Sequence, residues 1–382
     1  MSADATRRLV VFVGAVVFLD TMFFAAIAPL LPTYVGELDL SKGGAGVLIA
    51  AYPAGVLLAA VPAAVLAARL GVRPTVVVGL VILAAASLGF GLAESGEALC
   101  AFRFLQGVGG ACAWAGGFAW LTSATPPDRR GEVIGAALGA AIAGSIFGPV
   151  LGGIAEATDP ALAFGGVGVL AALLSLLALL LPPARAEGRL GLRTAILGSA
   201  DRRLVQGAWL VALFGLVAGS VEVLAPLRLD ALGWGTALVA GTFLVASAIQ
   251  AAMQPLAGRV SDRRGRESPA RVCLLAAAVV LAVLAWPPHA LPVALLVVVV
   301  ITAIGVLWTP GMALLSDGTE SLGISQAMGF SVANITWSLG QTTGSAGGGA
   351  LAGATNDAIP YTVLALLCAM TLFVIRTRRR SG

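Results

Sequence analysis

The chain has 382 residues, of which 59% are hydrophobic and 11% are charged, and its mean hydropathy is +0.97. Soluble globular domains carry about 45–50% apolar and about 25% charged residues. These apolar side chains exceed what a protein core could bury, which excludes an ordinary soluble domain and favours a membrane protein. The formal net charge of +4 does not indicate a nucleic-acid partner, because the arginines lie in short loops between apolar runs.

Apolar runs of the length that a bilayer requires, about 20 residues, recur along the whole chain. The first six predicted spans are 9–34, 44–68, 74–93, 99–124, 134–156 and 161–182. The second six are 205–229, 236–258, 270–288, 291–315, 326–351 and 359–376. A longer polar connector separates the two sets. We therefore expect an all-α membrane protein with a six-helix bundle over 1–183, a cytoplasmic linker over 184–204 and a second six-helix bundle over 205–382.

Charged residues alternate between the loops and so predict the orientation. The basic loops hold Arg7, Arg8, Arg69, Arg73, Arg129, Arg130, Arg185, Arg189, Arg193, Arg202, Arg203, Arg259, Arg263, Arg264, Arg266, Arg271, Arg376 and Arg378 to Arg380. The other loops are mostly acidic, and Lys42 and Arg228 are the exceptions there. Because cytoplasmic loops carry an excess of Lys and Arg, we expect a multi-pass protein of the cell (inner) membrane with both termini in the cytoplasm.

A short loop pattern occurs at the same place in each half. After the eighth span the chain reads Gly258-Arg-Val-Ser-Asp262-Arg263-Arg-Gly265-Arg266, and after the second span it reads Ala64-Val-Leu-Ala-Ala68-Arg69-Leu-Gly71-Val-Arg73. The repetition indicates internal duplication. The pattern resembles the G-x-x-x-D-R-x-G-R loop motif of the major facilitator superfamily. In the first copy alanines replace the glycine and the aspartate, so we expect the second copy to be the stronger gating element.

Two further spans carry glycine patterns. The fourth contains Arg103-Phe-Leu-Gln106-Gly107, which is similar to the R-x-x-Q-G signature of the same superfamily. The fifth contains Gly144-Ser-Ile-Phe-Gly148-Pro149-Val-Leu-Gly152-Gly153, which resembles the motif of its proton-coupled antiporters, and a weaker echo occurs at Gly340, Gly344 and Gly348. Glycines four residues apart let two helix backbones approach closely, although isolated pairs of this kind are common in membrane proteins.

The first and seventh spans resemble one branch of the superfamily. Phe18-Leu-Asp20-Thr-Met, followed by Ala28-Pro-Leu-Leu-Pro-Thr-Tyr34, is similar to the first helix of twelve-span drug:proton antiporters, especially the vesicular amine transporter-like group. Glu222-Val-Leu-Ala-Pro226-Leu resembles a segment of the same relatives. The chain departs from them in two places: Asn334 replaces an aspartate, and Pro53 lies near the position of a lysine. The departure puts monoamine specificity in question.

Three charged residues fall well inside the predicted spans: Asp20, Arg103 and Glu222. A charge at mid-bilayer costs about 2.5–3.5 kcal/mol on insertion scales, so such residues usually face a cavity or a pathway. The resemblance implies that their spans surround a central cavity. We expect Glu222 to be the first candidate for proton or cation coupling. Asp20 and Arg103 either take part in coupling or form an ion pair that only stabilises the first bundle.

Aromatic and polar residues in the same spans are candidates for contact with substrate, because aromatic faces attract organic cations. They are Trp114, Trp308, Thr309, Asn334 and Trp337. Residues of these types in a span more often serve helix packing or anchoring at the membrane interface, and that alternative stays open for each of them.

These features predict a monomeric, proton-coupled secondary transporter that exports lipophilic, cationic small molecules by alternating access, as in multidrug resistance. The alternative is a facilitator or proton symporter for a small metabolite. We do not expect an enzyme, because the spans contain no HExxH pair and the single histidine, His289, lies in a loop. No G-x-x-x-x-G-K-[ST] loop is present, so an ion gradient should supply the energy. The four cysteines have no metal-like spacing, and neither a cofactor nor a metal is expected; the expected partners are the substrate, protons and the lipid bilayer.

Overall fold

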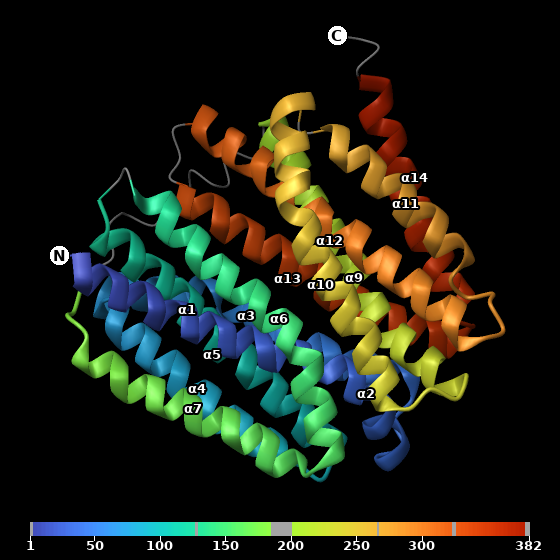
Figure 1. Cartoon of the computed structure of the whole chain (residues 1–382), viewed down its shortest axis with the longest axis horizontal. Coiled ribbons are helices and arrows are strands. Elements are labelled where there is room, and N and C mark those ends of the chain that lie inside the picture. Colours follow the sequence, from blue (N-terminus) through green and yellow to red (C-terminus); the bar gives the residue numbers. More distant parts are fainter. Residues whose placement is uncertain (1–2, 127–128, 185–200, 266, 323–325, 379–382) are drawn as a thin grey trace. The chain divides into compact units, whose positions relative to one another are not determined.

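The computed structural model describes residues 3–126, 129–184, 201–265, 267–322 and 326–378. Within these ranges the chain is helical and no strand is found (Figure 1). The helices are α1 (Ala3–Ala25), α2 (Ile27–Glu37), α3 (Lys42–Leu70), α4 (Val72–Gly91), α5 (Gly96–Ala124), α6 (Arg130–Ala157), α7 (Pro160–Leu180), α9 (Arg202–Ala231), α10 (Thr236–Arg264), α11 (Glu267–Val283), α12 (Ala290–Ser321), α13 (Gln326–Ala354) and α14 (Ala358–Arg378).

The first predicted span consists of two helices in the structure. α1 ends at Ala25 and α2 begins at Ile27, yet the apolar stretch Thr6–Glu37 continues through both. Pro29 lacks the backbone N–H that would bond to the carbonyl of Ala25, and the N–H of Ala26 is shared between Met22 O at 3.1 Å and Phe23 O at 3.3 Å. When α1 and α2 are taken as one span, the helices follow the twelve predicted spans in order.

Nine helices of the described ranges are long and apolar enough to cross a membrane. The other three, α5, α11 and α13, fall short for local reasons. α11 has only 17 residues, whereas α5 and α13 are rich in glycine and polar residues. The predicted class, an all-α membrane protein, is confirmed.

The chain forms two compact units. Unit 1 comprises Met1–Leu30 with Ala51–Gly191, and unit 2 comprises Leu31–Ala50 with Leu192–Gly382. Residues 185–200 of the predicted linker lie outside the described residues, so the predicted domain boundaries remain a prediction.

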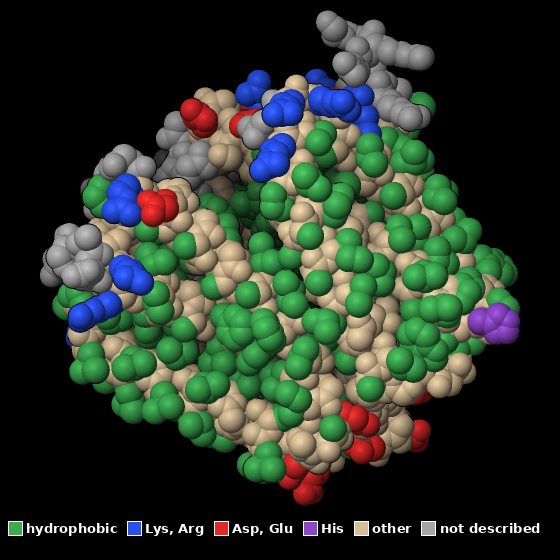
Figure 2. Space-filling view, viewed as in Figure 1, with side chains coloured by type: hydrophobic (Ala, Val, Ile, Leu, Met, Phe, Trp, Pro, Cys, Tyr) green, Lys and Arg blue, Asp and Glu red, His purple; other side chains and the backbone are tan. Residues whose placement is uncertain are grey.

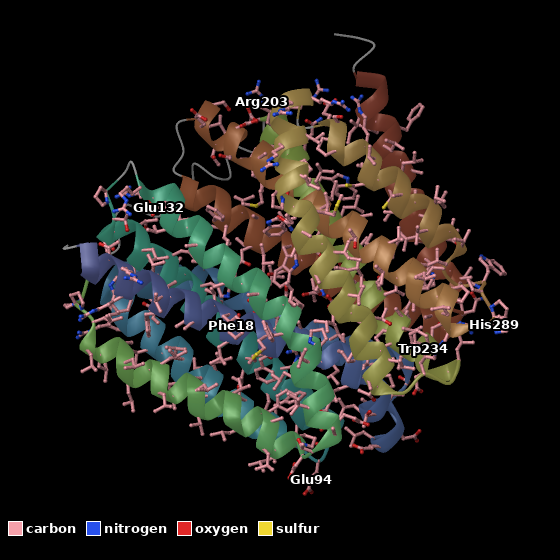
Figure 3. The ribbon with its side chains drawn as sticks, viewed as in Figure 1. Phe18, Glu94, Glu132, Arg203, Trp234 and His289 are labelled. Carbon is pink, nitrogen blue, oxygen red and sulfur yellow. The ribbon has the colours of Figure 1, made fainter. Side chains whose placement is uncertain are left out.

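In unit 1, the glycines of the fifth predicted span let α6 lie directly against α1 (Figure 1). A Cβ atom at Gly148 would lie 2.4 Å from the Cβ of Ala25, and one at Gly152 would lie 2.4 Å from the carbonyl oxygen of Ala26. Farther along the same interface, Phe18 (labelled in Figure 3) packs on Phe147 with ring centroids 6.0 Å apart. Only residues without a side chain permit this approach.

Unit 2 repeats the arrangement with the glycine echo of α13. Each of its three glycines faces α9 so closely that a Cβ atom would overlap a neighbouring atom. At Gly348 that neighbour is the hydroxyl of Ser220, at 2.6 Å. The same hydroxyl donates a 2.8 Å hydrogen bond to the carbonyl of Gly344. The pairs α6–α1 and α13–α9 therefore use the same close packing.

The turn glycines of the two loop copies adopt the same backbone conformation. Gly71 has φ +97° and Gly265 has φ +85°, in the left-handed region that residues with a Cβ atom rarely adopt. In the first copy, Arg73 donates to the carbonyl oxygens of Leu181 at 3.2 Å and Leu179 at 3.4 Å, at the end of α7. The positive φ of the turn explains why both copies of the motif have a glycine at this position.

Large apolar side chains cover the outside of the helices, and Figure 2 shows them spread over the visible face. Leu180 is 81% exposed and Val272 is 69% exposed. Such exposure would be unfavourable in water and is expected in contact with lipid.

Four of the residues labelled in Figure 3 lie at the ends of the units. In unit 1, Glu132 lies in the first turn of α6 at one end, and Glu94 follows α4 at the other. In unit 2, Arg203 lies in the first turn of α9 at one end, and His289 precedes α12 at the other. At the start of α9, Asp201 accepts hydrogen bonds from the N–H groups of Leu204 and Arg203. These bonds hold the pKa of Asp201 below its ordinary value.

Candidate functional site

Asp20 is the central buried charge of unit 1. It lies near the C-terminal end of α1 and is 0% exposed. Its Oδ2 accepts a 2.7 Å hydrogen bond from the hydroxyl of Tyr52 in α3 and a 2.9 Å bond from the indole N–H of Trp114 in α5. Its Oδ1 accepts no hydrogen bond from the described residues. A carboxylate in this position keeps one oxygen available for another donor.

Two glycines of α5 make room for this arrangement. A Cβ atom at Gly107 would overlap the carbonyl oxygen of Tyr52, so Gly107 allows the backbones of α3 and α5 to touch. A Cβ atom at Gly110 would lie 2.9 Å from Asp20 Oδ1 and 3.0 Å from the Tyr52 hydroxyl. The glycine that ends the R-x-x-Q-G pattern therefore brings Tyr52 to Asp20, and Gly110 leaves space for the carboxylate.

Arg103 lies in the same buried region and is also 0% exposed. Its Nη1 donates to Oε1 of Gln106, and its Nη2 donates to the carbonyl of Phe24 at 3.4 Å. The guanidinium carbon lies 5.3 Å from the ring centroid of Tyr52, within the range of a cation–π interaction.

Tyr52 therefore lies between Asp20 and Arg103. From the sequence, these two residues were expected either to form an ion pair or to take part in coupling. Among the described residues, the hydrogen bonds to Asp20 come from Tyr52 and Trp114. Arg103 attracts the Asp20 carboxylate electrostatically and contacts the ring of Tyr52, whose hydroxyl binds Asp20. The roles predicted for the two charged residues remain predictions.

Glu222 lies in α9 of unit 2 and is partly buried. Its Oε2 accepts a 2.7 Å hydrogen bond from Nε2 of Gln341 in α13. Gln341 is 0% exposed, and its Oε1 accepts no hydrogen bond from the described residues. Since Gln341 follows Gly340 directly, the close α9–α13 packing places the amide on the carboxylate.

The predicted substrate residues divide between the two units. Trp114 binds Asp20 and stacks on Phe118 with centroids 5.4 Å apart, in unit 1. In unit 2, Trp308 and Trp337 pack against one buried apolar cluster formed by Leu204, Val211, Leu315 and Ala333. Thr309 donates to Oε1 of Gln254 at 3.2 Å, and Asn334 is partly buried in α13.

The predicted gating residues lie at helix ends. Arg69 and Arg263 are exposed, and the space around Gly258 is open. Arg266 lies outside the described residues, and so does the side chain of Asp262. The proposed asymmetry between the two loop copies therefore stays a prediction.

Sequence reasoning missed Tyr52, which donates a hydrogen bond to Asp20, and Gln341, which donates one to Glu222. It had named Trp114, the other donor to Asp20. Tyr52 is adjacent to Pro53, near the position where the related transporters have a lysine. Gln341 is adjacent to the glycine echo. The neighbours Pro53 and Gly340 had been singled out in the sequence, and they were the signal that could have led to Tyr52 and Gln341.

A helical membrane protein with charged residues buried among its spans is the architecture of a transporter, and comparisons with known proteins assign the family. The sequence model of the Major Facilitator Superfamily matches residues 13–341, so the chain belongs to this superfamily of membrane transporters.

Among solved structures, the chain is similar to a bacterial homolog of the human lysosomal transporter Spinster. The likeness to its inward-facing, unoccupied form has a TM-score of 0.80 at 16% identity and covers 98% of both chains. The occupied form gives a TM-score of 0.77 at 16% identity over 99% of this chain and 98% of that one. At this identity the likeness concerns the fold.

The curated relatives match a shorter part of the chain than the solved structures do. A Danio rerio protein named "Probable vesicular acetylcholine transporter-B" is 31% identical over 140 residues, which is 34% of this chain and 28% of the relative. The multidrug resistance protein MdtL of Escherichia coli is 29% identical over 104 residues, 27% of each chain. The matched segments thus span about a quarter of these curated relatives.

Proposed function

We propose that this transporter exports lipophilic, cationic small molecules in exchange for protons, by alternating access across the cell membrane. The observation that carries the proposal is the buried carboxylate of Asp20, which has two neutral donors on one oxygen and no described donor on the other.

Such a carboxylate suits an exchange of cations. A charged group inside the membrane is costly, and it is neutralised either by a proton or by a cationic ligand. Binding of one then excludes the other at the same oxygen. This competition is the simplest physical basis for coupling proton entry to cation export.

The aromatic surroundings favour an organic cation over a metal ion. Trp114 contacts Asp20 and stacks on Phe118, and aromatic faces attract ammonium groups, most strongly where water is excluded. Glu222, with Gln341 bound to it, provides a second intramembrane carboxylate in unit 2. We assign both carboxylates to proton coupling.

The relatives agree with this proposal in part. One is named as a vesicular acetylcholine transporter and another as a multidrug resistance protein. Acetylcholine carries a quaternary ammonium, so that name fits cation export. Asn334 stands where the amine transporters that the chain resembles have an aspartate, so we do not extend the proposal to monoamines.

The experiment is transport of ethidium, a lipophilic cation, by the purified protein in liposomes. An antiporter accumulates ethidium when the lumen is acidic and loses it when the gradient is reversed. Accumulation driven by external acid would instead show a symporter, and gradient-independent equilibration would show a facilitator. Either result would overturn the proposed exchange.

A further inference from the structure

The two basic residues that break the loop charge pattern, Lys42 and Arg228, lie in one pocket of unit 2. The cavity has a volume of about 420 Å³ and is lined by Lys42, Arg228, Trp286, Asn356, Asp357 and Ala358, among others. This volume falls within the range of about 300–1,000 Å³ that is typical of small-molecule sites. We call it the Lys42–Arg228 pocket.

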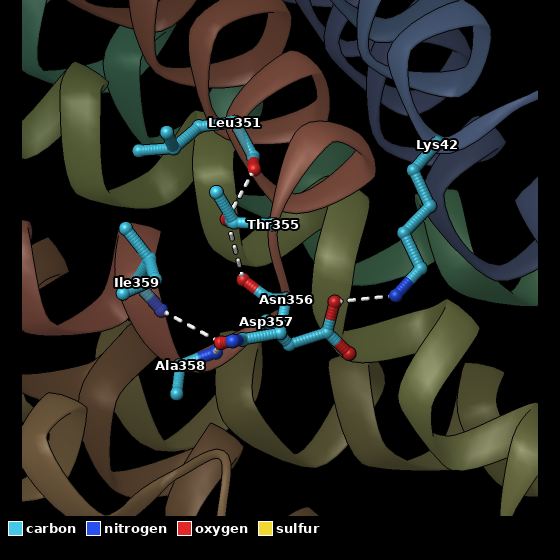
Figure 4. A network of polar contacts seen from close by, with 7 residues as sticks. All are labelled: Lys42, Leu351, Thr355, Asn356, Asp357, Ala358 and Ile359. Carbon is cyan, nitrogen blue, oxygen red and sulfur yellow. Dashed lines mark hydrogen bonds and ion pairs between the residues drawn. The ribbon is translucent and has the colours of Figure 1, made fainter.

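The pocket carries a net positive charge. Lys42 Nζ lies 2.5 Å from Asp357 Oδ1, and the two side chains are 40% and 19% exposed (Figure 4). This ion pair balances one of the two cations. No acidic residue of the pocket balances the charge of Arg228. The Lys42 ammonium has three N–H donors, so it retains further donors beside the one on Asp357.

Arg228 has a donor that the described residues do not satisfy. Its Nη2 donates to the carbonyl of Pro287 at 3.3 Å, whereas its buried Nε has no hydrogen-bond partner among the described residues. An unsatisfied buried donor is costly, and more so on a charged group. Because Nε is buried, a ligand in the pocket meets Arg228 through the exposed remainder of its side chain and through its positive charge.

The start of α14 adds to the positive potential. Ala358 is the first residue of this 21-residue helix and lines the pocket. Figure 4 shows Asn356 accepting the N–H of Ile359, and its Oδ1 accepts that of Ala358 at 3.0 Å and that of Ile359 at 3.3 Å. The positive end of a helix dipole favours an anion nearby.

We propose that the Lys42–Arg228 pocket binds a phosphate group, either the phosphodiester of an anionic lipid or free phosphate. Arginine and lysine are the side chains that bind phosphate in proteins. Trp286 at the pocket is 71% exposed, as expected of an aromatic anchor at a membrane interface. An organic cation does not fit, because it would meet two cations and one carboxylate that is already paired.

The test measures the shift of the thermal unfolding midpoint of the purified full-length protein in neutral detergent. The probes are inorganic phosphate, compared with chloride at equal ionic strength, and short-chain phosphatidylglycerol. A ligand that binds only the folded state raises the midpoint with concentration. We expect at least one probe to stabilise the wild type. A response to the lipid alone would identify a headgroup, and a response to phosphate would identify a solute anion.

The variants decide whether the stabilisation comes from this pocket. Arg228→Gln and Lys42→Gln should raise the half-saturating concentration at least threefold. The matched control Arg202→Gln removes an exposed charge at the other end of the same helix α9 and should not change it. Asp357→Asn should leave binding equal or tighter, because it removes the carboxylate that competes for Lys42.

Two results would overturn the proposal. One is the absence of stabilisation by either probe in the wild type. The other is undiminished stabilisation in both Lys42→Gln and Arg228→Gln. If Arg228→Gln does not fold, Arg228→Met, which also removes the charge, takes its place. Neither result depends on transport, so failure here leaves the proposed export untouched.

Discussion

Replacing Gly148 should separate α6 from α1 and thereby impair transport. A Cβ atom at this position would lie 2.4 Å from the Cβ of Ala25 and 2.9 Å from the carbonyl oxygen of Met22. Carbon atoms in favourable contact are about 3.5–4.0 Å apart. An alanine therefore increases the local separation of the two helices by about 1 Å, and a leucine increases it more.

Overpacking of this kind typically costs about 1–3 kcal/mol. The strain falls on α1, the helix that carries Asp20, whose partners Tyr52 and Trp114 come from other helices. A shift of this size disturbs hydrogen bonds of 2.7 and 2.9 Å. If about 1.4 kcal/mol of the cost appears in the transport barrier, the rate falls about tenfold.

Ethidium transport in liposomes, normalised to the folded protein incorporated, measures the effect. Gly148→Ala should reduce the rate about tenfold, and Gly148→Leu should abolish or uncouple transport. Gly139→Ala is the matched control, because it adds the same methyl group to α6 where nothing lies within 4 Å, and it should retain the wild-type rate. Full proton-coupled activity in Gly148→Leu would show that transport does not need the close approach of α6 to α1 and that the motif is incidental packing.

Three further expectations concern the loops, the site and the orientation. Asp262→Asn should impair transport with normal membrane insertion, while Ala68→Asp should matter less; equally large effects in the same transport assay would show that the two loop copies do not differ mechanically. Gly110→Ala places a methyl group about 3 Å from Asp20 and Tyr52 and should cost about 1–3 kcal/mol, seen as a lower unfolding midpoint together with slower transport; a variant unchanged in both would mean that this space is not needed. Tags at each end of the chain should be accessible only from the cytoplasm, and labelling of either tag from outside would exclude the predicted orientation.

The elements of the fold were predictable because bilayer-length apolar runs and alternating arginine loops are properties of the sequence itself. The close contacts of α6 with α1 were also accessible, since glycines four residues apart mark a helix face that admits another backbone. The break at Ala26 was missed, although Pro29, three residues later, was the signal for it. A continuous apolar run does not by itself reveal a helix interruption.

The partners of the buried carboxylates were not predictable in the same way. In a soluble helix the apolar face points inward, but in lipid both the buried and the exposed faces are apolar, so the pattern does not show which face points toward the other helices. Asp20 was recognised by its charge inside an apolar run and by the first-span segment that resembles drug:proton antiporters. Tyr52 reaches it only because α3 is rotated to face α5 across Gly107, and that rotation is a property of the packed bundle.

The most direct test of the central claim is the release of protons on substrate binding. Purified protein in weakly buffered detergent is mixed with ethidium, and the pH change is recorded per molecule bound. We predict that the wild type releases protons and that Asp20→Asn and Glu222→Gln, which keep the shape but lose the titratable group, each lose that release. Ethidium binding with normal proton release in both variants would contradict the account, because the exchanged proton would then reside elsewhere.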